Sequence, residues 1–401
     1  MNPFNPLFSV IVFSIAFSTG YIIKLYSKTN LIKGRYECID GMRGFLALAV
    51  FIHHSTAWYQ SFQLGDWEPS KSNLYEQLGK VSVSLFFMIT SFLFISKLLN
   101  AKEKGFNWRS FFISRFFRLV PMYYFSIWLV IVILLLIGQW PGKVGSSEFL
   151  ISIINWFFFR IHLIHTTTAT ELSCFFINLG VDWSLAYEWL FYFSLPLISL
   201  FILKIKPKIG YIIFSVFFII LFYKIHGIVE YHIYSFTGGA IAAILLKFTA
   251  LKDKIKDIYS SIIIFICLFL LGQFNNSENI YCILLITIIF TLIALGASIF
   301  GLLRNSVLKF LGEISYSTYL LHPILLFSVF RFGYSFDGMY LLSPLEYCLV
   351  TFAMTPILVF ISFLGFRYIE KINIDRAKKI IQNLENKEIS QMKAKAEGAN
   401  K

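Results

Sequence analysis

The chain has 401 residues, of which 57% are hydrophobic and 19% aromatic, while only 14% are charged. Soluble domains typically carry about 25% charged residues, so this chain has too few polar side chains to cover a compact surface in water. The composition excludes a water-soluble globule, and the arrangement of apolar residues in blocks excludes collagen, coiled coil and disorder. It predicts an all-α, polytopic membrane protein whose main solvent is lipid.

The formal net charge of +13 is interpreted as a topology signal rather than as a sign of a nucleic-acid partner. Basic residues gather in short segments between apolar blocks, which is typical of cytoplasmic loops. The five cysteines show no C-x-x-C spacing, so neither a disulfide framework nor a zinc knuckle is indicated. His162 and His165 are three residues apart without a second His or Cys cluster, and we expect no metal site there.

Residues 4–23 contain no charged side chain and are long enough to cross about 30 Å of hydrocarbon at about 1.5 Å per residue. The alternative is a signal peptide, but no Lys or Arg precedes the run and no small-residue cleavage site follows it. We therefore expect a transmembrane helix with its N-terminus outside.

Ten further apolar blocks follow, which makes eleven expected crossings. Segments expected inside hold most of the basic residues, and those expected outside are acidic or neutral, as the positive-inside rule requires. The chain would then divide into an extra N-terminal helix (1–34), a transmembrane core (35–370) and a cytoplasmic basic tail (371–401). The blocks lie near residues 43–59, 81–99, 119–138, 183–203, 209–225, 231–247, 260–273, 280–302, 314–332 and 345–367.

Two segments do not have the pattern of a transmembrane helix. Residues 149–163 are apolar but short and contain Arg160, so we expect a re-entrant or interfacial helix in a long outer loop. From Asp375 to Lys401 the chain is charged, with isoleucines and a leucine at near-helical spacing. This tail either lies on the inner leaflet as an amphipathic helix, or frays and stays solvated.

Arg43 and His54 form the first candidate site, because a charge inside a bilayer costs at least about 2.5–3.5 kcal/mol and needs a justification. Their spacing brings both side chains within about 20° of one helix face, about 16 Å apart along the axis. They would line one side of a pore or cleft, where the imidazole exchanges a proton and the guanidinium holds an anion. The alternative is that Arg43 snorkels at the inner interface and His54 caps the outer one.

Glu188 is the second candidate, in the stretch Asp182-Trp-Ser-Leu-Ala-Tyr-Glu, about a turn and a half inside the outer end of its helix. A carboxylate there needs a partner, and His54 is also expected near the outer face. A carboxylate that orients the imidazole would make it a better base. The alternative is a structural pair between Glu188 and a Trp or Tyr.

Arg115 and Arg118 form the third candidate, on an inner loop that leads into a helix. Their spacing of three puts both guanidinium groups on one face, suited to the phosphate oxygens of a cytoplasmic ligand. Ordinary anchoring at the inner leaflet is the alternative.

His322 lies about two turns into its helix near the hydroxyls of Tyr316 and Tyr319. It either joins the same polar cavity or bonds to backbone that the following proline leaves free.

Five motifs occur in order: Asp40-Gly-Met-Arg43 with ten residues to His54, Phe86-Phe87, Arg115-x-x-Arg118 followed by Leu119-Val-Pro-Met-Tyr-Tyr, Trp183-Ser-Leu-x-x-Glu188, and Ser315-Tyr-Ser-Thr-Tyr-Leu-Leu-His322. Together they resemble the acyltransferase 3 family of integral-membrane O-acyltransferases, from about Tyr36 to Ile369. The ten-helix core known in that family agrees with the ten blocks after the first. One departure is Thr90-Ser91-Phe92, where the family usually has Ser-Gly-Phe, which would alter a close helix contact.

The resemblance implies transfer of an acyl group, usually acetyl from cytoplasmic acetyl-CoA, to a sugar hydroxyl across the membrane. The acceptor would be a cell-envelope polysaccharide such as lipopolysaccharide, or its lipid-linked precursor. In the family's terms Arg43 and His54 are essential, Arg115 and Arg118 handle the donor, and Glu188 is assigned less directly. The residues expected to line the cavity are Asp40, Trp183, Ser184, Tyr316 and His322.

The resemblance further implies a multi-pass protein of the cytoplasmic (inner) membrane with its C-terminus in the cytoplasm. Acyl-CoA would be a co-substrate rather than a bound cofactor, no metal is expected, and the other partners would be the acceptor and membrane lipid. The linked hydrolase-like periplasmic domain of some family members is not expected, so loops or a partner would deliver the acceptor.

Two other classes compete with this interpretation. A secondary transporter or flippase for a lipid-linked sugar or small anion would use the buried Arg, His and Glu as a proton relay. It predicts an inverted repeat and paired broken helices, and we find neither in the sequence. A non-catalytic membrane scaffold predicts no need for titratable residues along one helix face.

Overall fold

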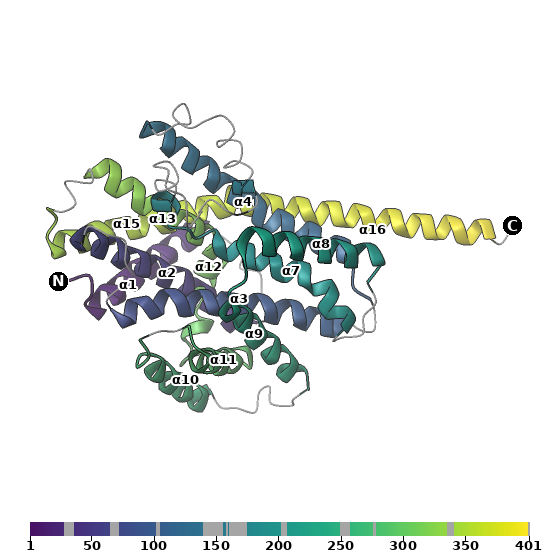
Figure 1. Cartoon of the computed structure of the whole chain (residues 1–401), viewed down its shortest axis with the longest axis horizontal. Helices are drawn as coiled ribbons and strands as arrows, with labels where there is room; N and C mark the ends of the chain where they lie inside the picture. The colour runs from purple at the N-terminus through teal and green to yellow at the C-terminus, as the bar shows by residue number, and fades with distance from the viewer. Residues whose placement is uncertain are drawn as a thin grey trace.

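The protein, seen in a computed structural model, is a bundle of helices from which one long C-terminal helix projects (Figure 1). The structure describes residues 1–27, 36–64, 72–101, 105–138, 155–157, 159, 175–201, 207–248, 257–275, 278–334 and 341–399. No strand occurs among these residues, which confirms the all-α, polytopic architecture expected from the composition.

A helix lies at each of the eleven apolar blocks, so the expected elements are confirmed as helices. They are α1 (Pro6–Ser27), α2 (Glu37–Leu64), α3 (Asn73–Ala101), α4 (Trp108–Leu136), α7 (Trp183–Phe201), α8 (Ile209–His226), α9 (Glu230–Phe248), α10 (Asp257–Leu271), α11 (Ile280–Ala294), α13 (Ser315–Gly333) and α15 (Pro344–Gly365). Within the described residues, three further elements were not predicted as separate helices: η2 (Leu302–Arg304), α12 (Ser306–Glu313) and the π-helix η3 (Phe366–Glu370). The tail, for which a helix was one of two alternatives, forms α16 (Lys371–Ala399).

Not every one of these helices qualifies as a full membrane span by length and apolar character. Six described stretches do: α1, α3, α4, α7, α8 and the continuous run Pro344–Gln391. The helices α10 and α11 have 15 residues each, which is about 22 Å and shorter than the hydrocarbon core of about 30 Å. The protein is a multi-pass membrane protein, and the count of eleven full crossings stays a prediction.

The helix α2 packs against α3, α12 and α13, and glycines let it approach α12 and η2 backbone to backbone. A Cβ added to Gly41 would lie 2.0 Å from a carbonyl oxygen of η2. A Cβ added to Gly44 would lie 2.5 Å from a carbonyl oxygen of α12. A Cβ on Gly312 of α12 would lie 1.9 Å from a carbonyl oxygen of α2. No side chain fits at these positions. Arg43 lies between Gly41 and Gly44 in the sequence, so these close contacts hold it beside the junction of α12 and α13.

At the other end of the chain, α15 continues through η3 into α16, which has 29 residues. The first part of α16 packs against α4, and the remainder extends away from the bundle, so the two termini lie at opposite ends of the molecule (Figure 1). The alternative that the tail frays is therefore wrong for the described residues, because α16 is a continuous helix from Lys371 to Ala399.

The re-entrant helix predicted near 149–163 lies largely outside the described residues, and so do His162 and His165.

Gly312→Ala is expected to lower the unfolding midpoint of the detergent-solubilised protein, because the added Cβ would force α2 and α12 apart. Overpacking of this kind costs about 1–3 kcal/mol. The control is Gly210→Ala in α8, where nothing lies within 4 Å of an added Cβ and little change is expected. Both midpoints can be read from thermal aggregation followed by size-exclusion chromatography, and equal midpoints would contradict the close approach of the two helices.

Candidate active site

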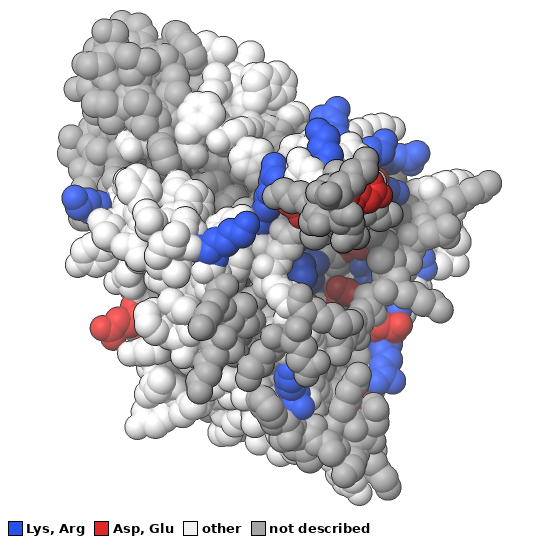
Figure 2. All heavy atoms as spheres, turned by 90° about the vertical axis from the view of Figure 1, so that its right-hand side faces the viewer, with Lys and Arg blue, Asp and Glu red and all other residues white. Residues whose placement is uncertain are grey.

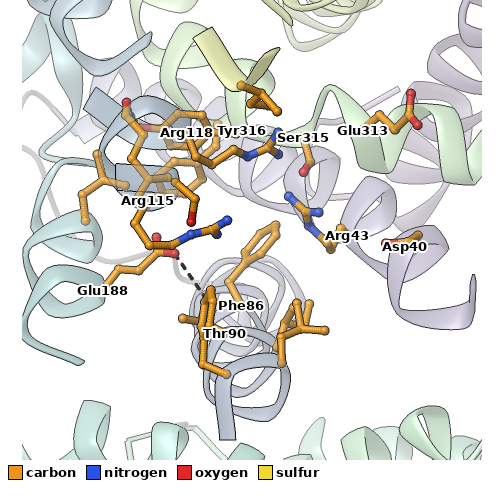
Figure 3. Close-up of a pocket in the computed structure, with 18 of the residues that line it drawn as sticks. Asp40, Arg43, Phe86, Thr90, Arg115, Arg118, Glu188, Glu313, Ser315 and Tyr316 are labelled. Carbon is orange, nitrogen blue, oxygen red and sulfur yellow. Dashed lines mark hydrogen bonds between the residues drawn. The ribbon is translucent and has the colours of Figure 1, made fainter. Parts of the chain in front are cut away.

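A cavity of about 610 Å³ opens between α2, α3, α4, α7, α13 and the first turns of α16 (Figure 3). Its walls combine apolar side chains with charged groups of both signs. It gathers seven of the residues that the sequence predicted for the site: Asp40, Arg43, Arg115, Arg118, Ser184, Glu188 and Tyr316.

Three guanidinium groups point toward the middle of this cavity, Arg43 from α2 and Arg115 and Arg118 from α4 (Figure 3). Arg118 is 3.5 Å from a carboxylate oxygen of Glu370, and Arg115 lies 4.9 Å from the centre of the Phe94 ring. Arg43 has no hydrogen bond or ion pair with any residue that the structure describes. A cation without a counter-ion on a cavity wall is suited to an anionic ligand.

Glu188 lies in this cavity rather than beside His54, which corrects the predicted pair. Its carboxylate accepts hydrogen bonds from the hydroxyl of Tyr192 and, at 3.4 Å, from the hydroxyl of Thr90 (Figure 3). The pair does not form because α7 presents Glu188 toward α3 and α4, whereas His54 lies further along α2. Thr90 thus supplies a hydroxyl to this carboxylate, and the buried hydroxyl of Ser91, which stands where the family usually has Gly, has no partner among the described residues.

The partner of His54 is a second imidazole. Nδ1 of His54 lies 2.7 Å from Nε2 of His322, and the two rings are within 12° of parallel. Nδ1 of His322 lies 3.1 Å from the carbonyl oxygen of Thr318, which can only accept a hydrogen bond. His322 must therefore carry its proton on Nδ1 and accept at Nε2, so His54 donates from Nδ1. In the neutral pair this leaves the lone pair of His54 on Nε2, as a general base or nucleophile requires.

The two imidazoles lie beyond the end of the cavity. His322 is fully buried, His54 keeps part of its surface exposed, and neither is among the described residues that line the cavity. Tyr319 does line it, and its ring packs on His322 with the ring centres 6.0 Å apart. The hydroxyl of Tyr319 is held by Ser184 at 2.8 Å. The predicted passage shared by Arg43 and His54 is therefore not found as one cavity: Arg43 lines the cavity and His54 does not, while Tyr319 lines it and contacts His322.

Two other predicted lining residues have different surroundings. Trp183 does not line the cavity; its ring lies against His232, with centres 4.5 Å apart. Tyr316 does line it, and its hydroxyl donates to the carbonyl oxygen of Leu119 at 2.8 Å. Tyr316 therefore joins α13 to α4 at the cavity wall.

Sequence reasoning missed Glu370, which is 1% exposed and lies in the π-helix η3. Its carboxylate accepts a hydrogen bond from the hydroxyl of Ser317 at 2.5 Å and pairs with Arg118. Single π-helical turns inside α-helices occur frequently at functional sites. The signal in the sequence was an acidic residue at the end of the last apolar block, between Arg367 and Lys371.

The fold and the site define a polytopic membrane protein with a partly cationic cavity and a buried pair of imidazoles. The sequence model of one family, described as an acyltransferase domain, matches residues 36–363, and the chain belongs to this acyltransferase 3 family. This confirms the family that the motifs indicated. The match covers α2 to α15 and leaves α1 and α16 outside it.

Similar proteins include a candidate O-acetyltransferase of Staphylococcus aureus (strain COL), 27% identical over 394 residues, which is 86% of this chain and 58% of that protein. A second candidate O-acetyltransferase, from strain MSSA476, is 26% identical over the same shares of the two chains. A candidate peptidoglycan O-acetyltransferase of Bacillus subtilis (strain 168) is 28% identical over 185 residues, 44% of this chain and 26% of that protein. The chain thus spans 58% of the length of the staphylococcal relatives. No solved structure matches the chain.

His322→Leu is expected to lower acyltransferase turnover by about 100-fold or more, because the proton on His54 Nδ1 loses its acceptor and the tautomer is released. His322→Gln can present its amide oxygen near the position of Nε2, so it should retain at least about tenfold more activity than the leucine variant. Initial rates of both purified variants at equal protein concentration test this. Equal losses in the two variants would mean that His322 only fills space.

Proposed function

We propose that the protein is an O-acyltransferase of the cytoplasmic membrane that moves an acyl group, most simply acetyl, from cytoplasmic acyl-CoA to a sugar hydroxyl of a cell-envelope polysaccharide or its lipid-linked precursor. Family membership supports acyl transfer, and the names of the staphylococcal relatives support O-acetyl transfer. The name of the Bacillus relative supports a peptidoglycan sugar as the acceptor class. The single observation that carries the proposal is a cavity that gathers three guanidinium groups and is lined by Tyr319, whose ring contacts the imidazole partner of His54.

The proposed orientation rests on the charges around the cavity. Its mouth includes Lys309 of α12 and Lys371 and Lys378 of α16. These belong to the segments that the positive-inside rule assigns to the cytoplasm. The two ends of the chain lie at opposite ends of the molecule, in agreement with an external N-terminus and a cytoplasmic C-terminus (Figure 1). An anionic donor from the cytoplasm would then enter where the cations are.

The donor would lie along the cavity with its thioester innermost. Arg115 and Arg118 are proposed to face its diphosphate from inside the cavity, and Arg43, with which no described residue pairs, is proposed to hold the pantetheine arm that passes it. The thioester meets His54 when the Tyr319 ring turns aside. The sugar hydroxyl would approach His54 through its exposed edge.

The chemistry can follow two routes, both of which use Nε2 of His54. In the first, Nε2 removes the proton of the sugar hydroxyl, the alkoxide attacks the thioester carbonyl, and the carbon–sulfur bond breaks to release CoA, whose thiolate takes the proton back. In the second, Nε2 attacks the thioester carbonyl, and the carbon–sulfur bond breaks so that CoA leaves as the thiolate. The sugar hydroxyl then attacks the acyl carbon, the bond from this carbon to Nε2 breaks, and the hydroxyl proton passes to the thiolate. In either route the proton on Nδ1 stays in its hydrogen bond to His322, which holds the reactive tautomer.

The test is acceptor-dependent release of CoA thiol from acetyl-CoA by the purified protein in proteoliposomes, with a muropeptide or lipid-linked disaccharide as acceptor. His54→Ala is expected to lower this rate by at least about 100-fold while leaving the protein folded, because the general base or nucleophile is lost. The matched control is His53→Gln. The side chain of His53 bonds instead to the carbonyl oxygen of Tyr75 at 2.8 Å, so most of the activity should remain.

Undiminished CoA release by His54→Ala would contradict the role given to His54. Movement of the sugar across the bilayer without thioester consumption would favour the transporter alternative instead. Acetylation of the acceptor, read as an added acetyl mass, completes the measurement.

A further inference from the structure

The mouth of the cavity is formed in large part by the C-terminal helix, which lies outside the residues matched to the family. Figure 2 looks at the end of the molecule from which α16 projects. Charged side chains of both signs gather around the helix there, and the surface is hollowed beside it. The residues of α16 that line the cavity are Lys371, Ile374, Asp375, Ala377, Lys378 and Ile381.

These residues form a stripe along α16. Lys371 and Lys378 are seven positions apart, so they share one face within about 20° and lie about 10 Å apart along the axis. Ile374 and Ile381 repeat the same spacing three positions on. One face of the helix thus offers the cavity two ammonium groups, with apolar side chains beside them.

The position of this stripe is fixed by the buried carboxylate that directly precedes α16. Glu370 accepts the hydroxyl of Ser317 at 2.5 Å and lies 3.5 Å from Arg118, so it joins the start of α16 to α13 and α4. Because Glu370 is 1% exposed, loss of Arg118 would leave its charge buried without a partner, and loss of Ser317 would remove a hydrogen bond to it. The lysines of the stripe are therefore held at the mouth of the cavity.

The ion pair between Glu370 and Arg118 also reduces the positive charge that the deep end of the cavity presents to an anion. The charge of Arg118 is already balanced by Glu370, and the carboxylate of Glu188 lies beside Arg115 (Figure 3). Coenzyme A carries a diphosphate in the middle and a further phosphate on the ribose at its far end. A donor with its thioester innermost therefore leaves its most charged end at the mouth.

The cations at the mouth are weakly engaged. Lys371 has no ion pair among the described residues. Lys378 pairs with Asp375 at 3.0 Å, but both side chains are at least half exposed, and such a surface pair is easily exchanged for a phosphate. Lys309 pairs at 3.1 Å with Glu37, whose side chain is 45% exposed.

We propose that α16 is part of the donor site and that Lys371 and Lys378 bind the phosphates at the nucleotide end of acyl-CoA. Lys371, which lies nearer the bundle, faces the diphosphate. Lys378, about two helical turns further along α16, faces the ribose 3′-phosphate. This inference rests on the proposed function, because it assumes that an acyl-CoA is the donor. It adds contacts to the nucleotide end of the donor beyond those proposed for Arg115 and Arg118.

The experiment compares acetyl-CoA with acetyl-dephospho-CoA, which lacks only the 3′-phosphate, at a fixed acceptor concentration. Lys378→Ala is expected to raise the KM for acetyl-CoA about tenfold with little change in kcat, and to leave the KM for acetyl-dephospho-CoA unchanged. Lys379→Ala is the matched control, because the neighbouring lysine is exposed and not among the residues that line the cavity.

An unchanged KM for acetyl-CoA, or an equal rise for both donors, would overturn the assignment. An equal rise is the result expected if Lys378 served only to hold α16 on anionic lipid headgroups. Binding of adenosine 3′,5′-bisphosphate, measured by calorimetry in detergent, provides a readout that does not need turnover. A wild-type protein that binds this probe through Lys378 but consumes no acetyl-CoA would contradict the proposed function and not the nucleotide site.

Discussion

A polar group buried in an apolar helix bundle must find a partner inside the protein, and this constraint determines the site. His322 satisfies it through the carbonyl oxygen of Thr318 and through His54. Arg118 satisfies it through Glu370. Two groups that do not satisfy it mark where a ligand is expected. Within the described residues, Arg43 makes no hydrogen bond or ion pair, and the buried Nε of Arg115 has no hydrogen-bond partner.

The partnered groups form the framework that positions the unpartnered ones. The glycine contacts between α2 and α12 set the height of Arg43 in the cavity, and His54 follows on the same helix. The histidine pair joins α2 to α13, while the Glu370 contacts join α13 and α4 to the start of α16. One connected set of helices thus carries the cavity, His54 and the part of α16 at the cavity mouth. A donor held at the mouth is therefore aligned with His54 at the other end.

The helices could be predicted from the sequence because apolar blocks of sufficient length have few alternatives to a helix in lipid. Their ends could not always be placed. The predicted block 280–302 ends as a helix at Ala294, because Gly296 takes a φ of 113° and turns the chain toward η2 and α12. The short helix α12 was missed because its eight residues lie within the length of an ordinary connection.

The convergence of Arg43, Arg115 and Arg118 could be expected, because each lies at the same end of its apolar block. The choice of partners could not, since it depends on how the helices rotate against one another. Glu188 was assigned to His54 from their common depth, yet α7 turns its carboxylate toward Thr90 and Tyr192. His322 bonds to the carbonyl oxygen of Thr318 and also holds His54, a combination that sequence spacing does not reveal.

The most direct test is a structure of the protein bound to a non-hydrolysable thioether analogue of acetyl-CoA. We expect the carbon that replaces the thioester carbonyl within about 3.5 Å of Nε2 of His54, the Tyr319 ring turned aside, and the nucleotide against α16. An analogue whose acyl end stays on the cavity side of an unmoved Tyr319, or whose nucleotide lies at the opposite end of the bundle, would contradict this arrangement.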